Sequence, residues 1–535
     1  MYKGVKMEKI LITGKIHPSA IQQFKSLKSY QVIYEPDVRR ERLEDLISDC
    51  LVIVTRSETK LDNKLIDRAQ KLKIIARAAV GVSNIDIDYA TEKGILVINT
   101  PGKNTNSAAE HTMGLMLSMM RKIPQAFIKM KSGGWDRHLF SGFELKDKCI
   151  GLLGLGNVGH RVAKFAKGFD MQVYAYDPYI APKLFTRHGV VPSQSPYDLA
   201  SQVSILSCHV PLNKETKGMI DRKVLEKLPE GSYIVNTSRG GVVNENDLLK
   251  ELDKGKILGC AFDTWEDEPL PKRELVEHPL VWCSPHIGAS TLEAQKKIGQ
   301  TIFEQVHKAL GGGVVDFPVN LPQVTSIDNP YIVPYATLAE KIGTAISQIR
   351  SFNPTSLEIS YRGDLVNVDK GLIKLGLMKG YVNFSSNAYV SYVNASSHFK
   401  TLGLELLESD IHLDKEEKSA MLISLKGDKG DLLKIGGIVY DQKYMRLTTI
   451  NDFYFDIKPT GTFLIIENED QPGVIGDIGS QLASSKININ SFDLSRREQG
   501  GDALAIIQID TLVGRKNLED LKKVNHIKSV KQIVL

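Results

Sequence analysis

The chain has 535 residues, of which 42% are hydrophobic and 24% are charged, and its formal net charge at pH 7 is +5. This composition can fill several hydrophobic cores, at a soft average of about 150 residues per domain, and the small charge gives no argument for nucleic-acid or membrane-surface binding. The sequence contains no run of about 18 apolar residues, so no transmembrane helix is predicted. The five cysteines are scattered without ligand spacing, so no metal site is predicted and a reduced, cytoplasmic chain is expected.

The first hundred residues alternate short apolar runs with helical patterns, and the short apolar piece at their start is expected to be a strand rather than a signal peptide. Such alternation predicts a parallel sheet covered by helices on both faces. Polar or glycine-rich turns follow the apolar runs, and ligands of open α/β sheets bind outside the carboxyl ends of the strands. The strands are expected at residues 10–13, 32–34, 51–55, 72–76 and 95–99.

A glycine-rich turn joins an apolar run to a helical pattern in IGLLGLGNVG, residues 150–159. Gly154 can make the tight turn, Gly156 lets the backbone approach a pyrophosphate, and Gly159 permits close packing of helix on strand. The next apolar run ends in Asp177, at the distance that suits an acid binding the adenosine ribose hydroxyls. A 2′-phosphate would meet a like charge there, so the motif favours NAD over NADP. The alternative is an ordinary glycine turn between strand and helix.

One long helix is expected over residues 105–130, because Met113, Leu117 and Met120 fall on one face. The alternation of strands and helices then continues to Pro285, with further buried strands near residues 203–207, 233–236 and 258–262. A helix over residues 292–310 follows. The chain therefore predicts two α/β units, and their sequence only weakly suggests that the second is inserted in the first.

Prolines 318 and 322 mark a boundary, after which residues 325–455 predict a mixed α/β segment. A helix is expected near residues 338–350, with strands near 356–361, 388–393 and 433–439. Residues 463–534 predict the order strand, helix, strand, strand, helix, strand, which is the βαββαβ arrangement of ferredoxin-like folds.

Three patches beyond the glycine turn carry residues with chemical potential. Arg239 follows a buried strand and can hold a carboxylate through two hydrogen bonds. His286 can exchange a proton near neutral pH, and a carboxylate such as Glu268 would fix its tautomer. Each residue also has a structural interpretation: Arg239 as a solvated charge, Glu268 as part of an acidic surface run, and His286 as a helix cap. Their order after a dinucleotide turn favours the catalytic interpretation.

These motifs resemble the NAD-dependent D-isomer-specific 2-hydroxyacid dehydrogenases over about residues 8–322. The similar segments are TRSETKLD, ARAAVGVSNIDIDYATEKGILVINTPG, LGLGNVG, YDP, VNTSRGGVVNENDLL and PHIGAST. The rest resembles the long form of the family, which adds an intervening domain and a C-terminal ACT domain. VSYVNASSH is similar to the VNAP stretch of that intervening domain without its proline, and ENEDQPGVIGDIG…ININS is similar to an ACT serine-binding turn.

The resemblance implies an α/β fold in which a Rossmann-type NAD-binding domain, residues 103–290, is inserted in a flavodoxin-like substrate domain, residues 1–102 and 291–322. A mixed α/β intervening regulatory domain, residues 323–457, and an ACT domain, residues 458–535, follow. The implied reaction is oxidation of 3-phospho-D-glycerate to 3-phosphohydroxypyruvate with NAD, the first step of L-serine biosynthesis. The implied assembly is a homotetramer with L-serine as its effector.

The resemblance also implies the roles of single residues. Catalysis falls to Arg239, Glu268 and His286. NAD is expected to contact Gly154, Gly156, Asn157, Val158, Gly159, Asp177, Val210, Thr237, Ser238, Asp263, Gly288 and Ala289. The substrate residues are Arg56, Ser57, Arg77, Val80, Gly81 and Arg137, the last reaching the site from a neighbouring subunit. The effector residues are Asn468, Asp470 and Asn488.

Two other functions stay open at this point. One is a glyoxylate or hydroxypyruvate reductase of the same class, against which the set of arginines and the ACT-like tail argue. The other is an NAD-sensing co-regulator that binds a protein partner without turnover, against which the intact set of Arg239, Glu268 and His286 argues. The absence of a basic patch makes nucleic-acid binding weaker still.

Overall fold

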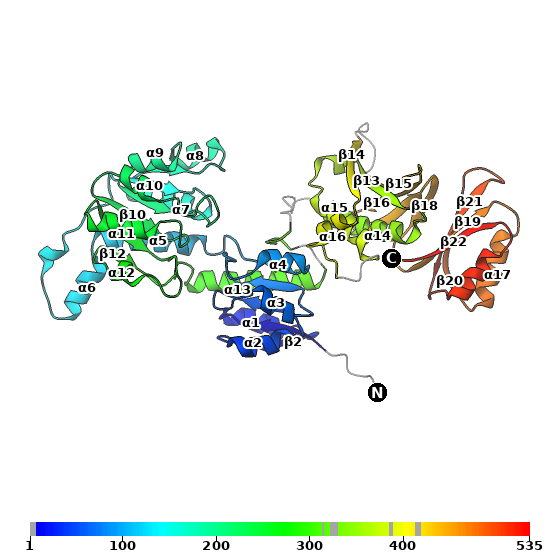
Figure 1. Cartoon of the computed structure of the whole chain (residues 1–535), viewed down its shortest axis with the longest axis horizontal. Coiled ribbons are helices and arrows are strands. Elements are labelled where there is room, and N and C mark those ends of the chain that lie inside the picture. Colours follow the sequence, from blue (N-terminus) through cyan, green and yellow to red (C-terminus); the bar gives the residue numbers. More distant parts are fainter. Residues whose placement is uncertain (1–6, 313–314, 322–329, 385–388, 412–418) are drawn as a thin grey trace. The chain divides into compact units, whose positions relative to one another are not determined.

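The structure, a computed structural model, describes residues 7–312, 315–321, 330–384, 389–411 and 419–535. The chain forms two compact units, one of Met1–Lys15, Phe24–Asn99 and Ile302–Leu535 and the other of Ile16–Gln23 and Thr100–Thr301. Four sheets lie within these units, and helices accompany each of them (Figure 1).

The first sheet has the strand order β2-β1-β3-β4-β5, and all neighbouring strands are parallel. Ile10, Val52 and Ile75 are fully buried in it, as expected for a parallel sheet with helices on both faces. This is the flavodoxin-like order, which confirms the predicted fold of the substrate domain. Its elements are β1 (Glu8–Ile12), α1 (Pro18–Lys25), β2 (Tyr30–Tyr34), α2 (Arg40–Ile47), β3 (Cys50–Thr55), α3 (Asn63–Arg68), β4 (Ile74–Arg77), α4 (Ile87–Glu92) and β5 (Leu96–Ile98).

The second sheet has the order β12-β11-β10-β9-β6-β7-β8 and is also parallel throughout. The order reverses between β6 and β9, and a dinucleotide binds at such a switch point in Rossmann folds. The predicted Rossmann-type fold is confirmed. The strands are β6 (Cys149–Leu153), β7 (Gln172–Tyr176), β8 (Val191–Pro192), β9 (Ile205–Cys208), β10 (Ser232–Asn236), β11 (Ile257–Phe262) and β12 (Val281–Cys283), with helices α7 (Asn157–Gly168), α8 (Pro182–His188), α9 (Pro196–Ser201), α10 (Arg222–Lys227), α11 (Glu245–Asp253) and α12 (Arg273–Val276).

The chain leaves the first sheet after β5 and returns to the same strand more than 200 residues later, after α13 (Leu292–Leu310). Pro318 bridges Ile98, and the Val319 amide donates to the Val97 carbonyl over 2.8 Å. The second sheet is therefore inserted in the first domain, as the family resemblance implies. The limits proposed for the four domains stay predictions, and the limit at 322/323 lies outside the described residues.

The helix expected over residues 105–130 is wrong as a single element. The structure has two helices, α5 (Thr105–Met120) and α6 (Ile123–Lys131), with a break at Lys122, whose φ is 53°. Pro124 explains the break, because its ring excludes it from a helix interior and suits the first turn of a new helix.

The third sheet, of order β14-β13-β15-β16-β17-β18, is mixed, since β13 and β14 are parallel and the other pairs are antiparallel. Tyr335, Tyr361 and Tyr381 are the largest side chains in its core. Its elements are α14 (Ile332–Ile349), β13 (Pro354–Arg362), α15 (Gly371–Asn383), α16 (Ala395–Thr401), β14 (Glu405–Ile411), β15 (Ala420–Gly427), β16 (Leu432–Tyr440), β17 (Tyr444–Ile450) and β18 (Phe453–Ile457).

The strand expected near residues 388–393 is wrong. Residue 388 lies outside the described residues, and residues 389–394 form a turn that leads into α16. The Asn394 side chain accepts a hydrogen bond of 2.8 Å from the Ser391 amide, so polar side chains bond the backbone here instead of a neighbouring strand.

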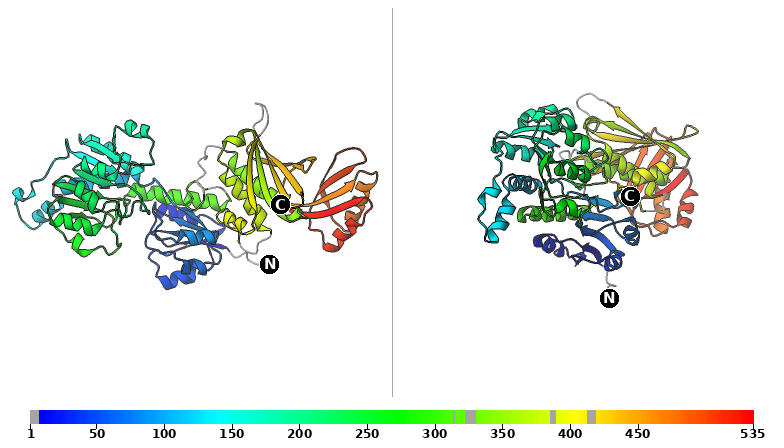
Figure 2. Two further views of the ribbon diagram at one scale, coloured as in Figure 1. Left: turned by 45° about the horizontal axis from the view of Figure 1, so that its top comes forward. Right: turned by 60° about the vertical axis from the view of Figure 1, so that its left-hand side comes forward.

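The fourth sheet, β20-β21-β19-β22, is antiparallel and belongs to a βαββαβ domain, as predicted. Its elements are β19 (Thr462–Glu469), α17 (Val474–Ser484), β20 (Ile489–Arg496), β21 (Asp502–Ile509), α18 (Arg515–Lys522) and β22 (Ile527–Val534). Figure 2 shows both helices on one face of the sheet, where Leu464 and Ile507 pack against Ile478. Side chains of the other face, including Phe463 and Ile506, join the core of the third domain.

Candidate active site

The glycine turn after β6 leaves no space for a side chain at Gly154 and Gly159 but is open at Gly156. Gly154 has a φ of 93°, which favours glycine, and a Cβ there would lie 2.7 Å from the carbonyl oxygen of His209. A Cβ on Gly159 would lie 2.1 Å from the carbonyl oxygen of Gly154. A Cβ on Gly156 would meet no described atom within 4 Å. The turn is thus tight against the protein and open at Gly156, where α7 begins and offers unpaired amides to an anion.

Asp177 follows β7 directly and is held by backbone amides. Its Oδ2 accepts a hydrogen bond of 2.9 Å from the Leu155 amide, and its Oδ1 accepts one of 3.0 Å from the Tyr179 amide. The first of these bonds ties the acid to the glycine turn. The carboxylate is therefore fixed beside the residues expected to hold the pyrophosphate.

The other residues expected to contact NAD follow the carboxyl ends of further strands of the same sheet. Val210 comes after β9, Thr237 and Ser238 after β10, Asp263 after β11, and Gly288 and Ala289 after β12; Asn157 and Val158 open α7. Thr237 Oγ1 lies 2.7 Å from Thr112 Oγ1, and Ser238 Oγ donates to Asn236 over 3.0 Å. The sheet thus brings these segments together at the carboxyl ends of its strands.

Arg239 lies at the end of the turn after β10. The Asn236 side chain donates to the Arg239 carbonyl over 2.9 Å and accepts from the Ser238 amide over 3.2 Å, so the turn is fixed from below. Burial lowers the pKa of Arg239, and the negative charge of nearby Glu268 opposes that shift. A partly desolvated guanidinium of this kind binds a carboxylate more strongly than a solvated one.

His286 and Glu268 form a hydrogen-bonded pair, with 2.7 Å between Nδ1 and Oε2. The other carboxylate oxygen of Glu268 accepts from the Trp265 amide over 3.0 Å. Burial raises the pKa of Glu268, but the bonds from His286 and Trp265 outweigh that effect and hold the pKa below its usual value. Glu268 is therefore ionised near neutral pH and can stabilise a protonated His286.

Asp263 holds the loop on which His286 lies. Its carboxylate accepts hydrogen bonds of 2.8 Å from the amides of both Ile287 and Gly288, and one of 2.6 Å from the Ser284 hydroxyl. His286 itself has a φ of 56°, in the left-handed region that non-glycine residues seldom adopt. The hydrogen bonds that the Ile287 and Gly288 amides donate to Asp263 support this backbone conformation. His111 from α5 joins the cluster, with its Nε2 2.9 Å from Ser284 Oγ.

The predicted substrate residues of the first sheet lie at the carboxyl ends of β3 and β4. Arg56 donates through Nη1 to the Lys15 carbonyl over 2.8 Å. Arg77 is only 6% exposed and donates through Nε to the Gly81 carbonyl over 3.0 Å. Arg77 therefore shapes the loop that contains Val80 and Gly81, and Ser57 follows Arg56 at the neighbouring strand end.

Arg137, the remaining predicted substrate residue, lies on an exposed apolar arm. The arm comprises α6, the short helix η1 (Arg137–Phe140) and the segment to Phe143, and Figure 1 shows α6 projecting from its domain. None of the side chains of α6 is buried. The exposed fractions are 50% for Ile123, 62% for Phe127, 66% for Ile128, 54% for Met130, 77% for Trp135, 64% for Leu139 and 49% for Phe143.

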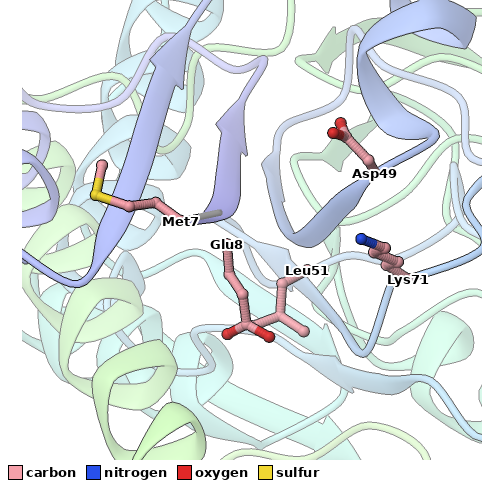
Figure 3. A pocket seen from close by; sticks show the side chains of 5 residues that line it. All are labelled: Met7, Glu8, Asp49, Leu51 and Lys71. Carbon is pink, nitrogen blue, oxygen red and sulfur yellow. The ribbon is translucent and has the colours of Figure 1, made fainter. Parts of the chain in front are cut away.

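A small pocket of about 70 Å³ opens at the opposite edge of the first sheet, lined by Met7, Glu8, Asp49, Leu51 and Lys71 (Figure 3). These residues lie at the amino ends of β1, β3 and β4 or just before them, whereas ligands of such sheets bind at the carboxyl ends. Pockets for small molecules usually measure ~300–1,000 Å³. This pocket is therefore no candidate for the substrate or for NAD.

The three predicted effector residues do not come together within one chain. Asn468 and Asp470 lie at the end of β19, near the start of β21, and Asp470 accepts from Arg496 over 2.8 Å. Asn488 precedes β20 and donates to Asp510 over 2.8 Å, at the other end of β21. The length of that strand separates the two ends by roughly 20 Å. Asn468 is 3% exposed, and its Oδ1 has no hydrogen-bond partner among the described residues.

Sequence reasoning missed several residues whose side chains hydrogen-bond to the segments around the candidate catalytic residues. They are Asn236 beneath Arg239, His111 and Ser284 beside Asp263, and Glu245, whose Oε1 accepts from the Glu266 amide over 2.8 Å. Asn236 and Glu245 lie inside the segment VNTSRGGVVNENDLL, and Ser284 directly precedes PHIGAST, but no role was expected for any of them. His111 lies outside these segments, and its partner Ser284 is far away in the sequence.

Two family models match the chain. Residues 113–288 match the D-isomer specific 2-hydroxyacid dehydrogenase, NAD binding domain, and residues 331–451 match the D-3-phosphoglycerate dehydrogenase intervening domain. No helix in the described parts of the chain is long and apolar enough to cross a membrane, and those parts hold no cluster of three or more metal-binding side chains.

The chain is similar along its length to curated proteins. D-3-phosphoglycerate dehydrogenase from Methanocaldococcus jannaschii is 36% identical over 531 residues, which cover 99% of this chain and all of the relative. The enzyme of the same name from Bacillus subtilis is 35% identical and covers 92% of this chain and 93% of its own. Among solved structures, D-lactate dehydrogenase from Aquifex aeolicus complexed with NAD and lactic acid has a TM-score of 0.52 and 26% identity, over 58% of this chain and 99% of that one. A glyoxylate reductase from Paecilomyes thermophila has a TM-score of 0.54 and 28% identity, over 59% and 99%.

Proposed function

The chain belongs to the D-3-phosphoglycerate dehydrogenases, a branch of the D-isomer specific 2-hydroxyacid dehydrogenases, and from this premise we propose how its residues divide the work. It is an NAD-dependent dehydrogenase that oxidises 3-phospho-D-glycerate to 3-phosphohydroxypyruvate, the first step of L-serine biosynthesis. The similarity to D-3-phosphoglycerate dehydrogenases over nearly the whole chain carries this conclusion.

The edge of the second sheet suits NAD. The open side of Gly156 and the amides that begin α7 would take the pyrophosphate, and Asp177 would bind the adenosine ribose. Because a 2′-phosphate would meet the charge of Asp177, the same residue favours NAD over NADP. The remaining cofactor contacts would come from Asn157, Val158, Val210, Thr237, Ser238, Asp263, Gly288 and Ala289. When bound, NAD accepts the hydride that leaves C2 of the substrate.

His286 is the proposed general base. Glu268 binds its Nδ1, which places a proton there and leaves Nε2 as the basic nitrogen that takes the hydroxyl proton of the substrate. The negative charge of Glu268 then stabilises the imidazolium that forms. Arg239 holds the substrate carboxylate and polarises the C2 oxygen, for which its partly desolvated guanidinium is suited.

The substrate phosphate and carboxylate need further donors, for which we propose Arg56, Ser57, Arg77 and the backbone amides at Val80 and Gly81. Arg137 would reach the site of a second copy from its exposed arm. The arm supports a homo-oligomer, because a contiguous set of large apolar side chains in water marks an interaction site. Phe127→Asp, expected to weaken the assembly in sedimentation velocity, tests this point, and a homotetramer is the assembly we expect.

We further propose that the βαββαβ domain is an ACT domain that binds L-serine. Asn468 with its unpaired oxygen and Asp470 lie too far from Asn488 for one amino acid to contact all three in a single chain. A serine site that uses them must take Asn488 from a second copy. We also keep the expectation of a cytoplasmic enzyme.

Oxidation of NADH with 3-phosphohydroxypyruvate, measured with and without L-serine, tests the function. We expect turnover that serine suppresses. Turnover that serine leaves unchanged would remove the effector site and keep the enzyme. Turnover with glyoxylate or hydroxypyruvate but not with the phosphorylated substrate would move the assignment to a reductase, and no turnover with any 2-keto acid would favour an NAD-sensing co-regulator.

A further inference from the structure

Glu245 is a buried carboxylate for which the mechanism above has no use. It is the first residue of α11 and is 2% exposed. The backbone just before it is well anchored, because Val243 bridges Ile220 and the Asn244 amide donates to the Ile220 carbonyl over 2.9 Å. These two contacts fix the backbone position from which the Glu245 side chain extends.

The partner of Glu245 is a backbone amide of another segment. Its Oε1 accepts from the Glu266 amide over 2.8 Å, and its Oε2 has no hydrogen-bond partner among the described residues, the Lys272 ammonium being 3.8 Å away. Burial raises the pKa of Glu245. The Lys272 ion pair is long and leaves Oε2 without a hydrogen bond, so the one short bond that Glu245 makes is to the Glu266 amide.

The amide that Glu245 holds belongs to the loop that presents Glu268. Within this loop the Trp265 amide donates to Glu268 over 3.0 Å, and the Trp265 indole donates to the Ser284 carbonyl over 3.2 Å, next to the segment of His286. Glu268 in turn binds His286 over 2.7 Å. A fixed position of residues 265 and 266 therefore fixes the pair of Glu268 and His286.

Glu245 also belongs to the segment of Arg239. Only glycine fits at position 240, because a Cβ there would lie 1.7 Å from the carbonyl oxygen of Trp265. The turn after Arg239 thus contacts the loop of Glu268 at Gly240, and a few residues further along the same segment Glu245 bonds that loop at Glu266. Two contacts, one steric and one a hydrogen bond, set the loop against this segment.

We propose that Glu245 is a positioning residue for the dehydrogenase reaction: its carboxylate fixes the loop of residues 263–268 against the Arg239 segment and so keeps Glu268 aligned with His286. This rests on the catalytic roles proposed for Arg239, Glu268 and His286. Misplacement of a catalytic group by about 1 Å can cost 10²-fold in rate, so loss of this one bond has a measurable effect on turnover.

The test compares Glu245→Ala and Glu245→Gln in the full-length enzyme. Gln keeps an acceptor for the Glu266 amide, so we expect kcat close to that of the unchanged enzyme. Ala removes the acceptor, and we expect kcat to fall about 10- to 100-fold with little change in KM for NAD. The acid limb of the kcat/KM profile should move to lower pH in the Ala variant, because a displaced Glu268 stabilises the protonated imidazole less.

Glu251 supplies the matched control. It lies on the same helix, is 3% exposed, and pairs with Lys254 over 2.6 Å instead of with the loop. Glu251→Ala should leave kcat and the pH profile unchanged. Glu245→Asp, which keeps the charge but withdraws the oxygen from the amide, gives a second folded variant and should lower kcat and move the acid limb in the same direction as Ala.

An unchanged kcat and pH profile in both Glu245→Ala and Glu245→Asp would overturn the proposal, and so would a Gln variant as impaired as Ala. His286→Ala separates this failure from failure of the catalytic assignment. If His286→Ala is inactive while the Glu245 variants are normal, only the positioning role falls. If His286→Ala is active, the assignment on which that role rests falls with it.

Discussion

The residues proposed for catalysis lie close together within one chain, whereas those proposed for effector binding lie far apart in it. Glu268 and His286 are 2.7 Å apart; the Trp265 amide donates to Glu268, and the Ile287 amide next to His286 donates to Asp263. Asp470 and Asn488 lie at opposite ends of β21 and are bound to separate partners, Arg496 and Asp510. The three residues proposed for catalysis are thus brought together by the fold of a single domain, whereas the proposed serine site would need residues from two chains.

The largest effect is expected at the base. His286→Ala should lower kcat by ~10²–10⁴, because one acid–base contribution is lost. Steady-state rates with 3-phosphohydroxypyruvate and NADH measure it, and NADH fluorescence checks that the cofactor still binds. Near-normal turnover would show that the pair of His286 with Glu268 is structural, and the proposed catalytic role of His286 would be wrong.

Asp177 tests the cofactor side of the same single-chain arrangement. Asp177→Ala should raise KM for NAD about 10- to 100-fold, the usual range for losing hydrogen bonds to a charged group, with a smaller change in kcat. Initial rates over a range of NAD concentrations give both constants. The ratio of NADP to NAD use should rise in the variant, and an unchanged ratio would contradict the ribose role.

Mixed oligomers test the comparison directly. Asp470→Ala and Asn488→Ala should each abolish serine inhibition, and a refolded mixture should recover part of it, because one of two sites in a mixed pair contains both native residues. A mixture of Arg239→Ala and His286→Ala should recover no activity, because all catalytic residues come from one chain. Serine inhibition that stays absent in the first mixture would mean that the effector site is not shared.

A smaller effect is expected on stability at low pH. Since the pKa of Glu268 is lowered in the folded state, its ionised form stabilises the fold at pH values above its unfolded pKa of about 4.3, and this contribution is lost as the pH falls through the folded pKa. The midpoint of thermal unfolding should be higher for the native enzyme than for Glu268→Gln at neutral pH. The two midpoints should converge in acid, and a constant difference would contradict the assignment.

How far sequence alone predicts this molecule depends on how local each feature is. The glycine turn and Asp177 lie within one βαβ unit, so spacing alone specifies them. The roles of Arg239, Glu268 and His286 came from resemblance, because their side chains converge only when β10, β11 and β12 are parallel neighbours. The break at Lys122 was signalled by Pro124, which the apolar periodicity of the segment concealed.

Contacts that depend on the exact alignment of distant segments could not be predicted from the sequence. Glu245 meets the Glu266 amide only because α11 follows a turn that is set by the bridge of Val243 with Ile220. The separation of Asp470 from Asn488 depends on the antiparallel pairing of β20 and β21, which places their ends far apart. The bridge of Val243 with Ile220 leaves no pattern in the residues themselves, whereas the pairing of β20 with β21 follows from the predicted βαββαβ order.

The return of the chain to β5 has a consequence for synthesis on the ribosome. Among the described residues, residues 317–319 pair with the outer side of β5, and they are made after the inserted residues 100–301. At ~5–20 residues per second the insertion takes roughly 10–40 s to translate. During that time the pairing edge of β5 lacks its later partner, and such an edge strand can pair with other chains. The order of synthesis therefore leaves the edge of the first-made sheet exposed until the chain returns to β5.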